Sequence, residues 1–320
     1  MRDSLTNAAP IIPAGVRPLI VGPSSGASLT MEEARLYGQQ QPWGFILFAR
    51  HCDNPAQVKQ LCHDLRQAVG RADAPILIDQ EGGRVRRLTP PHWPDQPAMA
   101  SFGVRYASGD IDGAIAAVKA LASQQAAMLQ ELGISVNCAP LLDVPIDGAD
   151  PIIGDRAFSQ DPAVVTLLGT AYAESLLAGG ITPIIKHLPG HGRANVDSHL
   201  DLPVIQASLA ELEQTDFVPF KALSAHFGSK IWAMTAHVVL NAVDSNLPAT
   251  LSPTVVQQIV RGSLGFHGLL LSDDVQMGAL KGDYGALSNQ ALQAGCDAVL
   301  LCNATVEQQR QTLAAVALTV

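Results

Sequence analysis

Short apolar runs alternate with helix-like segments along the whole chain. Each run has five to seven residues, which suits a buried strand and is too short for a typical helix. The eight runs span residues 18–22, 44–48, 75–79, 133–139, 181–185, 231–237, 268–274 and 297–301. One series of eight strand-then-helix units predicts an α/β fold, namely a single-domain (β/α)8 barrel of the TIM type over residues 1–320.

Helix-start signals support this alternation. They are capping boxes, or N-cap residues followed by proline at the first helical position. These signals are Thr30-x-x-Glu33, Asn54-Pro55, Asp161-Pro162, Ser208-x-x-Glu211, Ser252-Pro253 and Thr305-x-x-Gln308. Helices are also predicted over residues 111–132 and 284–294. The alternative is an open doubly wound sheet, but that fold usually has fewer units, and no G-x-G-x-x-G turn follows the first run.

Composition narrows the range of partners. The 320 residues are 48% hydrophobic and 15% charged, with a net charge of −9, which favours a large core and disfavours nucleic acid or anionic membranes as partners. No apolar run reaches the roughly 18 residues that span a bilayer. The five cysteines contain no C-x-x-C pair, and Met1–Asn7 lacks a signal-peptide pattern. We therefore expect a cytoplasmic monomer with reduced thiols.

The stretch from Lys186 to His199 has the highest density of reactive side chains. It follows a predicted strand and holds three histidines, a lysine, an arginine and an aspartate. In an extended segment Asp197 and His199 would point the same way, so the carboxylate could orient the imidazole for proton transfer. An ordinary surface loop is the simpler interpretation. A metal site formed by His187, His191 and His199 is another, although the usual zinc spacings are absent.

Polar residues also stand where other predicted strands end. In a barrel the carboxyl ends of the strands meet on one rim, which is where barrel enzymes carry their chemistry. At Asp273-Asp274 we expect only one carboxylate to face the rim, because neighbouring strand residues face opposite ways; a helix N-cap is the simpler interpretation. The segment 79–84 could be only a solvated salt-bridge cluster. The strand-end residues are Asp79, Lys186, His187, His237 and Asp273.

Four motifs together resemble glycoside hydrolase family 3. They are Asp-Gln-Glu-Gly-Gly-Arg-Val at 79–85, Lys-His-Leu-Pro-Gly-His-Gly at 186–192, Asp-Ser-His-Leu at 197–200 and Ser-Asp-Asp at 272–274. The chain looks most like the single-domain β-N-acetylglucosaminidases that recycle bacterial cell-wall muropeptides. The resemblance runs from about Val16 to about Asn303, with the motifs in the family's order and at predicted strand ends.

The resemblance implies a role for each matching residue. Asp273 would be the nucleophile, and Asp197 with His199 the acid/base dyad on a mobile loop. No cofactor or metal is implied. This chain departs from the family pattern at Leu188, where phenylalanine is typical, and at Met277-Gly278, where a glutamate between the two is missing. The implied substrate-binding residues are Asp79, Arg87, Arg156, Lys186 and His187.

The implied reaction is the release of terminal non-reducing N-acetylglucosamine from fragments that carry anhydro-N-acetylmuramic acid. A retaining exo-β-N-acetylglucosaminidase of this kind would form a covalent glycosyl-enzyme on Asp273, and the glycine-flanked loop would close over the carbohydrate. Three alternatives remain: a β-N-acetylglucosaminide phosphorylase on the same scaffold, a metal-dependent barrel hydrolase, and a non-catalytic sugar-binding protein.

Overall fold

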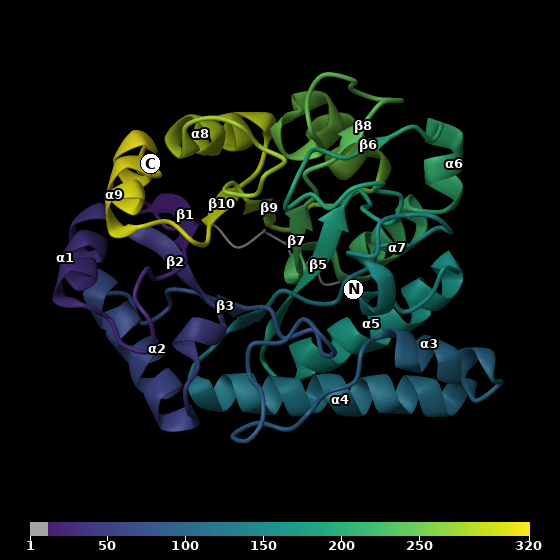
Figure 1. Cartoon of the computed structure of the whole chain (residues 1–320), viewed down its shortest axis with the longest axis horizontal. Helices are drawn as coiled ribbons and strands as arrows, with labels where there is room; N and C mark the ends of the chain where they lie inside the picture. The colour runs from purple at the N-terminus through teal and green to yellow at the C-terminus, as the bar shows by residue number, and fades with distance from the viewer. Residues whose placement is uncertain (1–11) are drawn as a thin grey trace, which may run out of the picture.

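The computed structural model describes residues 12–320, and within them eight parallel strands close into a barrel (Figure 1). The strands are β1 (Arg17–Val21), β2 (Pro42–Leu47), β3 (Ile76–Ile78), β4 (Val136–Asn137), β5 (Thr182–Leu188), β7 (Trp232–Thr235), β9 (Leu270–Asp274) and β10 (Ala298–Leu301). Around the ring their order is β1-β10-β9-β7-β5-β4-β3-β2. Each predicted run overlaps one of these strands, so the predicted (β/α)8 barrel is confirmed. The predicted absence of a signal pattern in Met1–Asn7 lies outside the described residues.

Helices surround the barrel and connect successive strands (Figure 1). They are α1 (Met31–Gln40), α2 (Pro55–Val69), α4 (Ile111–Leu132), α5 (Pro162–Ala178), α6 (Leu209–Gln214), α7 (Phe217–Phe227), α8 (Tyr284–Ala294) and α9 (Val306–Ala315). The side chains of the N-cap residues Thr30, Asn54, Asp161, Ser208 and Thr305 accept backbone N–H groups of the first turn, as their sequence signals predicted. Ser252 Oγ likewise accepts the backbone N–H of Val255 at 3.1 Å, and the helix that follows is a π-helix, η5 (Val255–Ser263).

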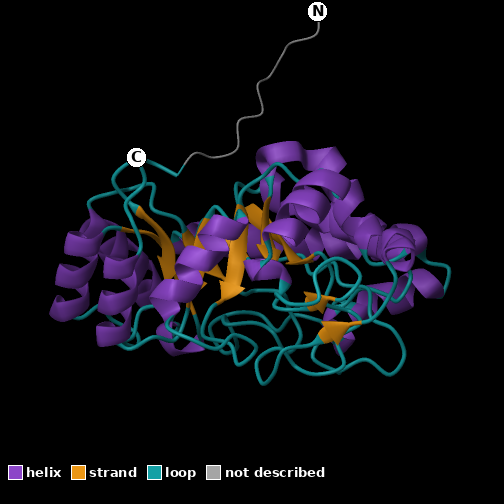
Figure 2. Cartoon of the chain, turned by 90° about the horizontal axis from the view of Figure 1, so that it is seen from above, coloured by secondary structure: helices purple, strands orange, loops and turns teal. Residues whose placement is uncertain are grey.

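Helix α3 and a small second sheet were not predicted. Helix α3 (Ala100–Ala107) lies in the connection after the prolines of 90–97. A separate two-stranded parallel sheet pairs β6 (Val204–Ile205) with β8 (Val239–Leu240), and Figure 2 shows it among the loops. A strand of two residues has no periodicity for a sequence pattern to reveal.

The barrel interior is filled by side chains, so a site has to lie at an end of the barrel and not inside it. Apolar side chains such as Ile20, Ile184 and Leu271 pack together inside the ring. The first residue of β7 and the second of β2, Trp232 and Trp43, stack with ring centroids 5.1 Å apart at the amino end. Long loops gather at the carboxyl end (Figure 2). No helix in the described part has the length and apolar character needed to cross a membrane.

Candidate active site

A cavity of about 290 Å³ opens at the carboxyl end of the barrel. It is lined by residues that end or follow β3, β5, β9 and β10, which is the placement expected for a barrel enzyme. Asp197 does not line the cavity, but its carboxylate is hydrogen-bonded to the ring of His199. The predicted residues that line the cavity are Asp79, Arg87, Arg156, Lys186, His187, His199 and Asp273.

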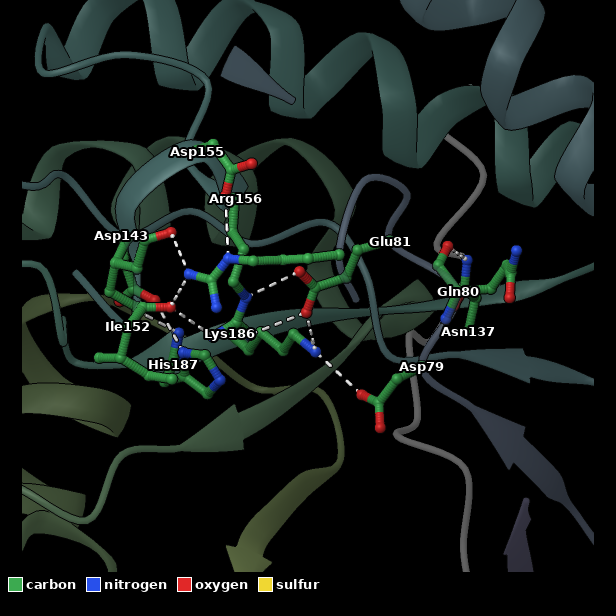
Figure 3. A network of polar contacts seen from close by, with 12 residues as sticks. Asp79, Gln80, Glu81, Asn137, Asp143, Ile152, Asp155, Arg156, Lys186 and His187 are labelled. Atoms are coloured by element: carbon green, nitrogen blue, oxygen red, sulfur yellow. Dashed lines mark hydrogen bonds and ion pairs between the residues drawn. The ribbon is translucent and has the colours of Figure 1, made fainter. Parts of the chain in front are cut away.

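A buried network of charges forms one wall of this cavity (Figure 3). Lys186 Nζ lies 3.0 Å from Asp79 Oδ1 and 2.6 Å from Glu81 Oε1. Arg156 donates to both oxygens of Glu81, at 2.8 and 2.9 Å. Arg87 Nη2 donates to Asp79 Oδ2 at 3.0 Å. The side chains of Lys186 and Glu81 are each only 3% exposed. The interpretation of 79–84 as a solvated salt-bridge cluster is therefore wrong for Asp79 and Glu81, whereas Arg84 does form a half-exposed ion pair with Asp155.

The ionised form of each group in the network is stabilised by the opposite charges beside it. Burial alone would raise the pKa of Glu81, but Arg156 and Lys186 outweigh burial and lower it. Burial alone would lower the pKa of Lys186, yet Glu81 and Asp79 raise it. These groups therefore stay ionised at neutral pH. Lys186 uses two of its three N–H groups in the network, so it can still donate to a ligand.

At the end of β9, both Asp273 and Asp274 line the cavity. Asp274 Oδ1 accepts the backbone N–H groups of Gln276 and Cys302, so the expectation that only one carboxylate faces the cavity stays a prediction. The pairing of β10 with β9 shifts between Ala298↔Leu271 and Leu300↔Asp274, so β9 holds one extra residue there. Such a bulge interrupts the alternation of side chains.

The two carboxyl groups differ in their electrostatics. Burial would raise the pKa of Asp273, but the imidazoles of His187 and His237 and the backbone N–H of Asp274 together lower it. Burial raises the pKa of Asp274 to about 6, despite hydrogen bonds from the backbone N–H groups of Gln276 and Cys302. Asp273 is thus an ionised carboxylate facing the cavity at neutral pH, as a nucleophile requires.

Asp197 and His199 are hydrogen-bonded, but through a turn and not an extended segment. Asp197 Oδ1 accepts both the backbone N–H and the ring Nδ1–H of His199, each at 2.8 Å. The backbone N–H groups of Leu200 and Asp201 both donate to the Asp197 carbonyl. The carboxylate therefore fixes the ring tautomer and leaves Nε2 for proton transfer. The His199 side chain is 59% exposed, so it stands at the mouth of the cavity.

Two buried residues behind the cavity wall were not among the predicted site residues. Asp143, which follows β4, accepts hydrogen bonds from His187 and His191. A carboxylate in the otherwise apolar segment 141–144, directly after a strand, is the sequence signal that could have identified it. Glu81 was noted only as part of the 79–84 segment, and its pairing with Arg156 could not be predicted.

His237 does not line the cavity, in contrast to the predicted meeting of all the polar strand ends. Its ring is fully buried, with Nδ1 2.7 Å from Thr250 Oγ1 and Nε2 3.0 Å from the carbonyl oxygen of Asp274. Burial lowers its pKa. His237 therefore supports the end of β9 from behind.

Comparison with known proteins identifies the family. The model of the glycosyl hydrolase family 3 N-terminal domain matches residues 25–319. The chain belongs to this family. It is thus a glycoside hydrolase, as the sequence motifs predicted.

This family 3 chain is similar to named proteins and to solved structures. A beta-hexosaminidase of Bordetella avium is 37% identical over 287 residues, which cover 87% of this chain and 79% of the relative. The structure of NagZ from Neisseria gonorrhoeae in complex with N-trifluoroacetyl-D-glucosamine matches with a TM-score of 0.84 and 33% identity, over 94% of this chain and 86% of that one. A second structure of NagZ, in complex with zinc ion, has a TM-score of 0.83 and 32% identity and covers the same shares of the two chains.

The metal-site interpretation of this family 3 chain finds no support in the side-chain geometry. Among residues 12–320 no three His, Cys, Asp or Glu side chains are grouped so that they could hold an ion. His187 and His191 are instead bonded to Asp143 and Ser198.

Proposed function

We propose that this protein is a retaining exo-β-N-acetylglucosaminidase. Its substrate would be a muropeptide fragment, N-acetylglucosamine linked to anhydro-N-acetylmuramic acid, and its role the recycling of peptidoglycan. The observation that carries the proposal is that the ionised Asp273 and the imidazole of the Asp197–His199 dyad face one cavity. The names of the relatives, and the glucosamine derivative bound to one of them, support this choice of sugar.

The buried charge network would bind the sugar. Lys186 and Arg87 offer N–H groups, and the Asp79 carboxylate can accept from sugar hydroxyls. Because these groups are fixed by one another, little conformational entropy is lost when the sugar enters. The network would hold the non-reducing sugar with its anomeric carbon above Asp273.

In the first chemical step, Asp273 attacks the anomeric carbon and the glycosidic bond breaks. The leaving oxygen takes the proton from His199 Nε2, so the aglycone departs as an alcohol and His199 becomes neutral. The product of this step is an ester between the sugar and Asp273. The lowered pKa of Asp273 keeps the attacking carboxylate ionised.

In the second step, a water attacks the same carbon and gives its proton to His199 Nε2. The ester bond breaks, Asp273 leaves as a carboxylate, and the sugar is released with its original β configuration. Two inversions at one carbon give net retention. No cofactor enters either step.

Leaving-group dependence tests this mechanism. After chelation, Asp273→Ala is expected to lose at least 10³-fold in kcat on both an aryl β-N-acetylglucosaminide and the natural disaccharide. His199→Ala is expected to lose far more on the disaccharide than on the aryl substrate, because an activated phenol leaves without protonation. NMR should show the β-anomer as the first product.

The outcome that contradicts the proposal is near wild-type turnover by Asp273→Ala, or a wild-type activity that chelation abolishes and added zinc restores. A phosphorylase remains the second candidate, because an exposed imidazole repels phosphate less than a second carboxylate would. Formation of a sugar 1-phosphate in phosphate buffer, with little turnover in phosphate-free buffer, would favour it.

We further propose that residues 1–320 form one domain that works as a cytoplasmic monomer. The five cysteines are unpaired, and four of them are buried, which suits a reducing compartment. Sedimentation at working concentration tests the monomer. A dimer that persists at nanomolar concentration would contradict it.

A further inference from the structure

Asp143 is a buried carboxylate that the proposed mechanism does not use. It lies in the loop after β4 and is fully buried. Its Oδ2 lies 2.7 Å from His187 Nδ1, and its Oδ1 accepts the backbone N–H groups of His187 and His191, at 3.3 and 2.7 Å. Burial would raise the pKa of Asp143, but the two histidines lower it. An ionised acceptor is therefore held at the start of the loop that carries the proposed acid/base dyad.

The first consequence concerns the ring of His187. A carboxylate can only accept hydrogen bonds, so His187 Nδ1 must donate to Asp143. This contact fixes the ring (Figure 3), and Nε2 is the nitrogen left for a ligand in the cavity that His187 lines. Without Asp143 the ring could rotate or change tautomer, and its hydrogen bond to the sugar would be lost.

The second consequence concerns the dyad itself. His191, whose backbone is bonded to Asp143, has its Nε2 2.9 Å from Ser198 Oγ. His191 Nδ1 is buried without a partner, so the proton of the neutral ring belongs on Nε2, where Ser198 can accept it. Ser198 is buried and stands between Asp197 and His199 in the sequence. Hydrogen bonds through His191 and Ser198 thus connect the buried Asp143 carboxylate to the segment that carries Asp197 and His199.

We propose that Asp143 is a positioning residue that orients both His187 in the cavity wall and the segment that carries the acid/base dyad. It holds His187 directly, and through His191 and Ser198 it positions the segment that carries His199. This inference rests on the proposed function, because it assigns Asp143 to the supports of that nucleophile and acid/base pair.

The test compares three variants in the full chain, each with an activated aryl substrate and with the natural disaccharide. Ser198→Ala should lower kcat on the disaccharide about 10-fold or more and change it less than 3-fold on the aryl substrate, because only the acid is displaced. KM should stay unchanged, since the sugar-binding network is intact. Asp143→Asn should lower kcat/KM on both substrates about 100-fold, with a raised KM, because His187 is also released.

Ser288→Ala is the matched control. Ser288 is likewise fully buried, but its hydroxyl donates to the Tyr284 carbonyl within α8. It should lose a comparable amount of stability and no activity on either substrate. If Asp143→Asn fails to fold, Ser198→Ala alone decides the question.

The inference is overturned if Ser198→Ala loses the same factor on both substrates, or no more than Ser288→Ala does. It is also overturned if folded Asp143→Asn keeps wild-type kcat and KM. These results are distinct from failure of the proposed function, which would appear as an active Asp273→Ala or a His199→Ala variant without leaving-group dependence.

Discussion

Asp273 and Asp274 are neighbours in the chain, yet their surroundings move their pKa values in opposite directions. Asp273 faces imidazoles that favour its ionised form, whereas Asp274 is buried beside that charge and its pKa rises to about 6. Carboxyl pairs separated in this way are typical of sites in which one group must be ionised at neutral pH. The same difference makes a prediction about stability.

Asp274→Asn should remove a cost to folding that grows with pH. The folded pKa of about 6 exceeds the ordinary value of 3.8, so between about pH 4 and pH 6 the folded state binds more protons than the unfolded state. The contribution of Asp274 to the free energy of unfolding therefore falls as pH rises through this window, by about 3 kcal/mol.

Urea unfolding of wild type and Asp274→Asn at pH 4, 5, 6 and 7 checks this. The variant should gain relative to wild type with rising pH, because asparagine oxygen can still accept the N–H groups of Gln276 and Cys302. A stability difference that is the same at all four pH values would contradict the raised pKa.

At the scale of elements, the loops after β5 and β9 are packed against each other. Gly278 and Ala279 donate their backbone N–H groups to the carbonyls of His199 and Ser198, at 3.0 and 3.1 Å. A Cβ on Gly278 would lie 2.5 Å from the His199 carbonyl oxygen. At the shortened Met277-Gly278 sequence, the backbone of the loop after β9 therefore packs directly against the backbone of the segment that carries the proposed acid/base dyad.

Gly278→Ala should therefore displace the dyad. The added methyl carbon would clash with the backbone carbonyls of His199 and Leu200, so the segment that carries His199 has to shift, which we expect to lower kcat on the natural disaccharide about 10- to 100-fold. The cost in stability should be about 1–3 kcal/mol. Gly26→Ala is the control, because its Cβ would meet nothing closer than 3.4 Å. Equal activity in the two variants would show that this packing does not position His199.

The sequence predicted the helices and strands of the barrel better than the details of the site. Apolar runs predicted every barrel strand, because burial on both faces requires continuous hydrophobic sequence. Polar residues at strand ends predicted the cavity wall, because parallel strands share one rim. The bulge in β9 and the turn at Asp197 could not be predicted, since both depend on pairing and packing outside the local sequence. Asp143 and Glu81 gain their importance only through partners that lie far away along the chain.

At the scale of the whole molecule, the two ends of the barrel have different tasks. The carboxyl end carries the ionised side chains, while Trp43 of β2 and Trp232 of β7 meet at the amino end. Three strands separate β2 from β7 on either side of the ring. The tilted indole pair, with its planes 31° apart, therefore joins opposite sides of the barrel. Such contacts at this end contribute to stability and not to chemistry.

Trp232→Ala should accordingly weaken folding without changing catalysis. The lost indole leaves a cavity and removes the cross-barrel stack, which should lower the free energy of unfolding by about 3–5 kcal/mol. Below the new unfolding transition kcat and KM should stay within 2-fold of wild type, because the polar wall at the other end is untouched. Circular dichroism during urea unfolding measures the first effect, and hydrolysis of an aryl β-N-acetylglucosaminide measures the second. Trp232→Phe should fall between wild type and Trp232→Ala in stability. A folded Trp232→Ala variant with strongly reduced kcat would contradict this separation, since it would mean that packing at the amino end sets the geometry around Asp273.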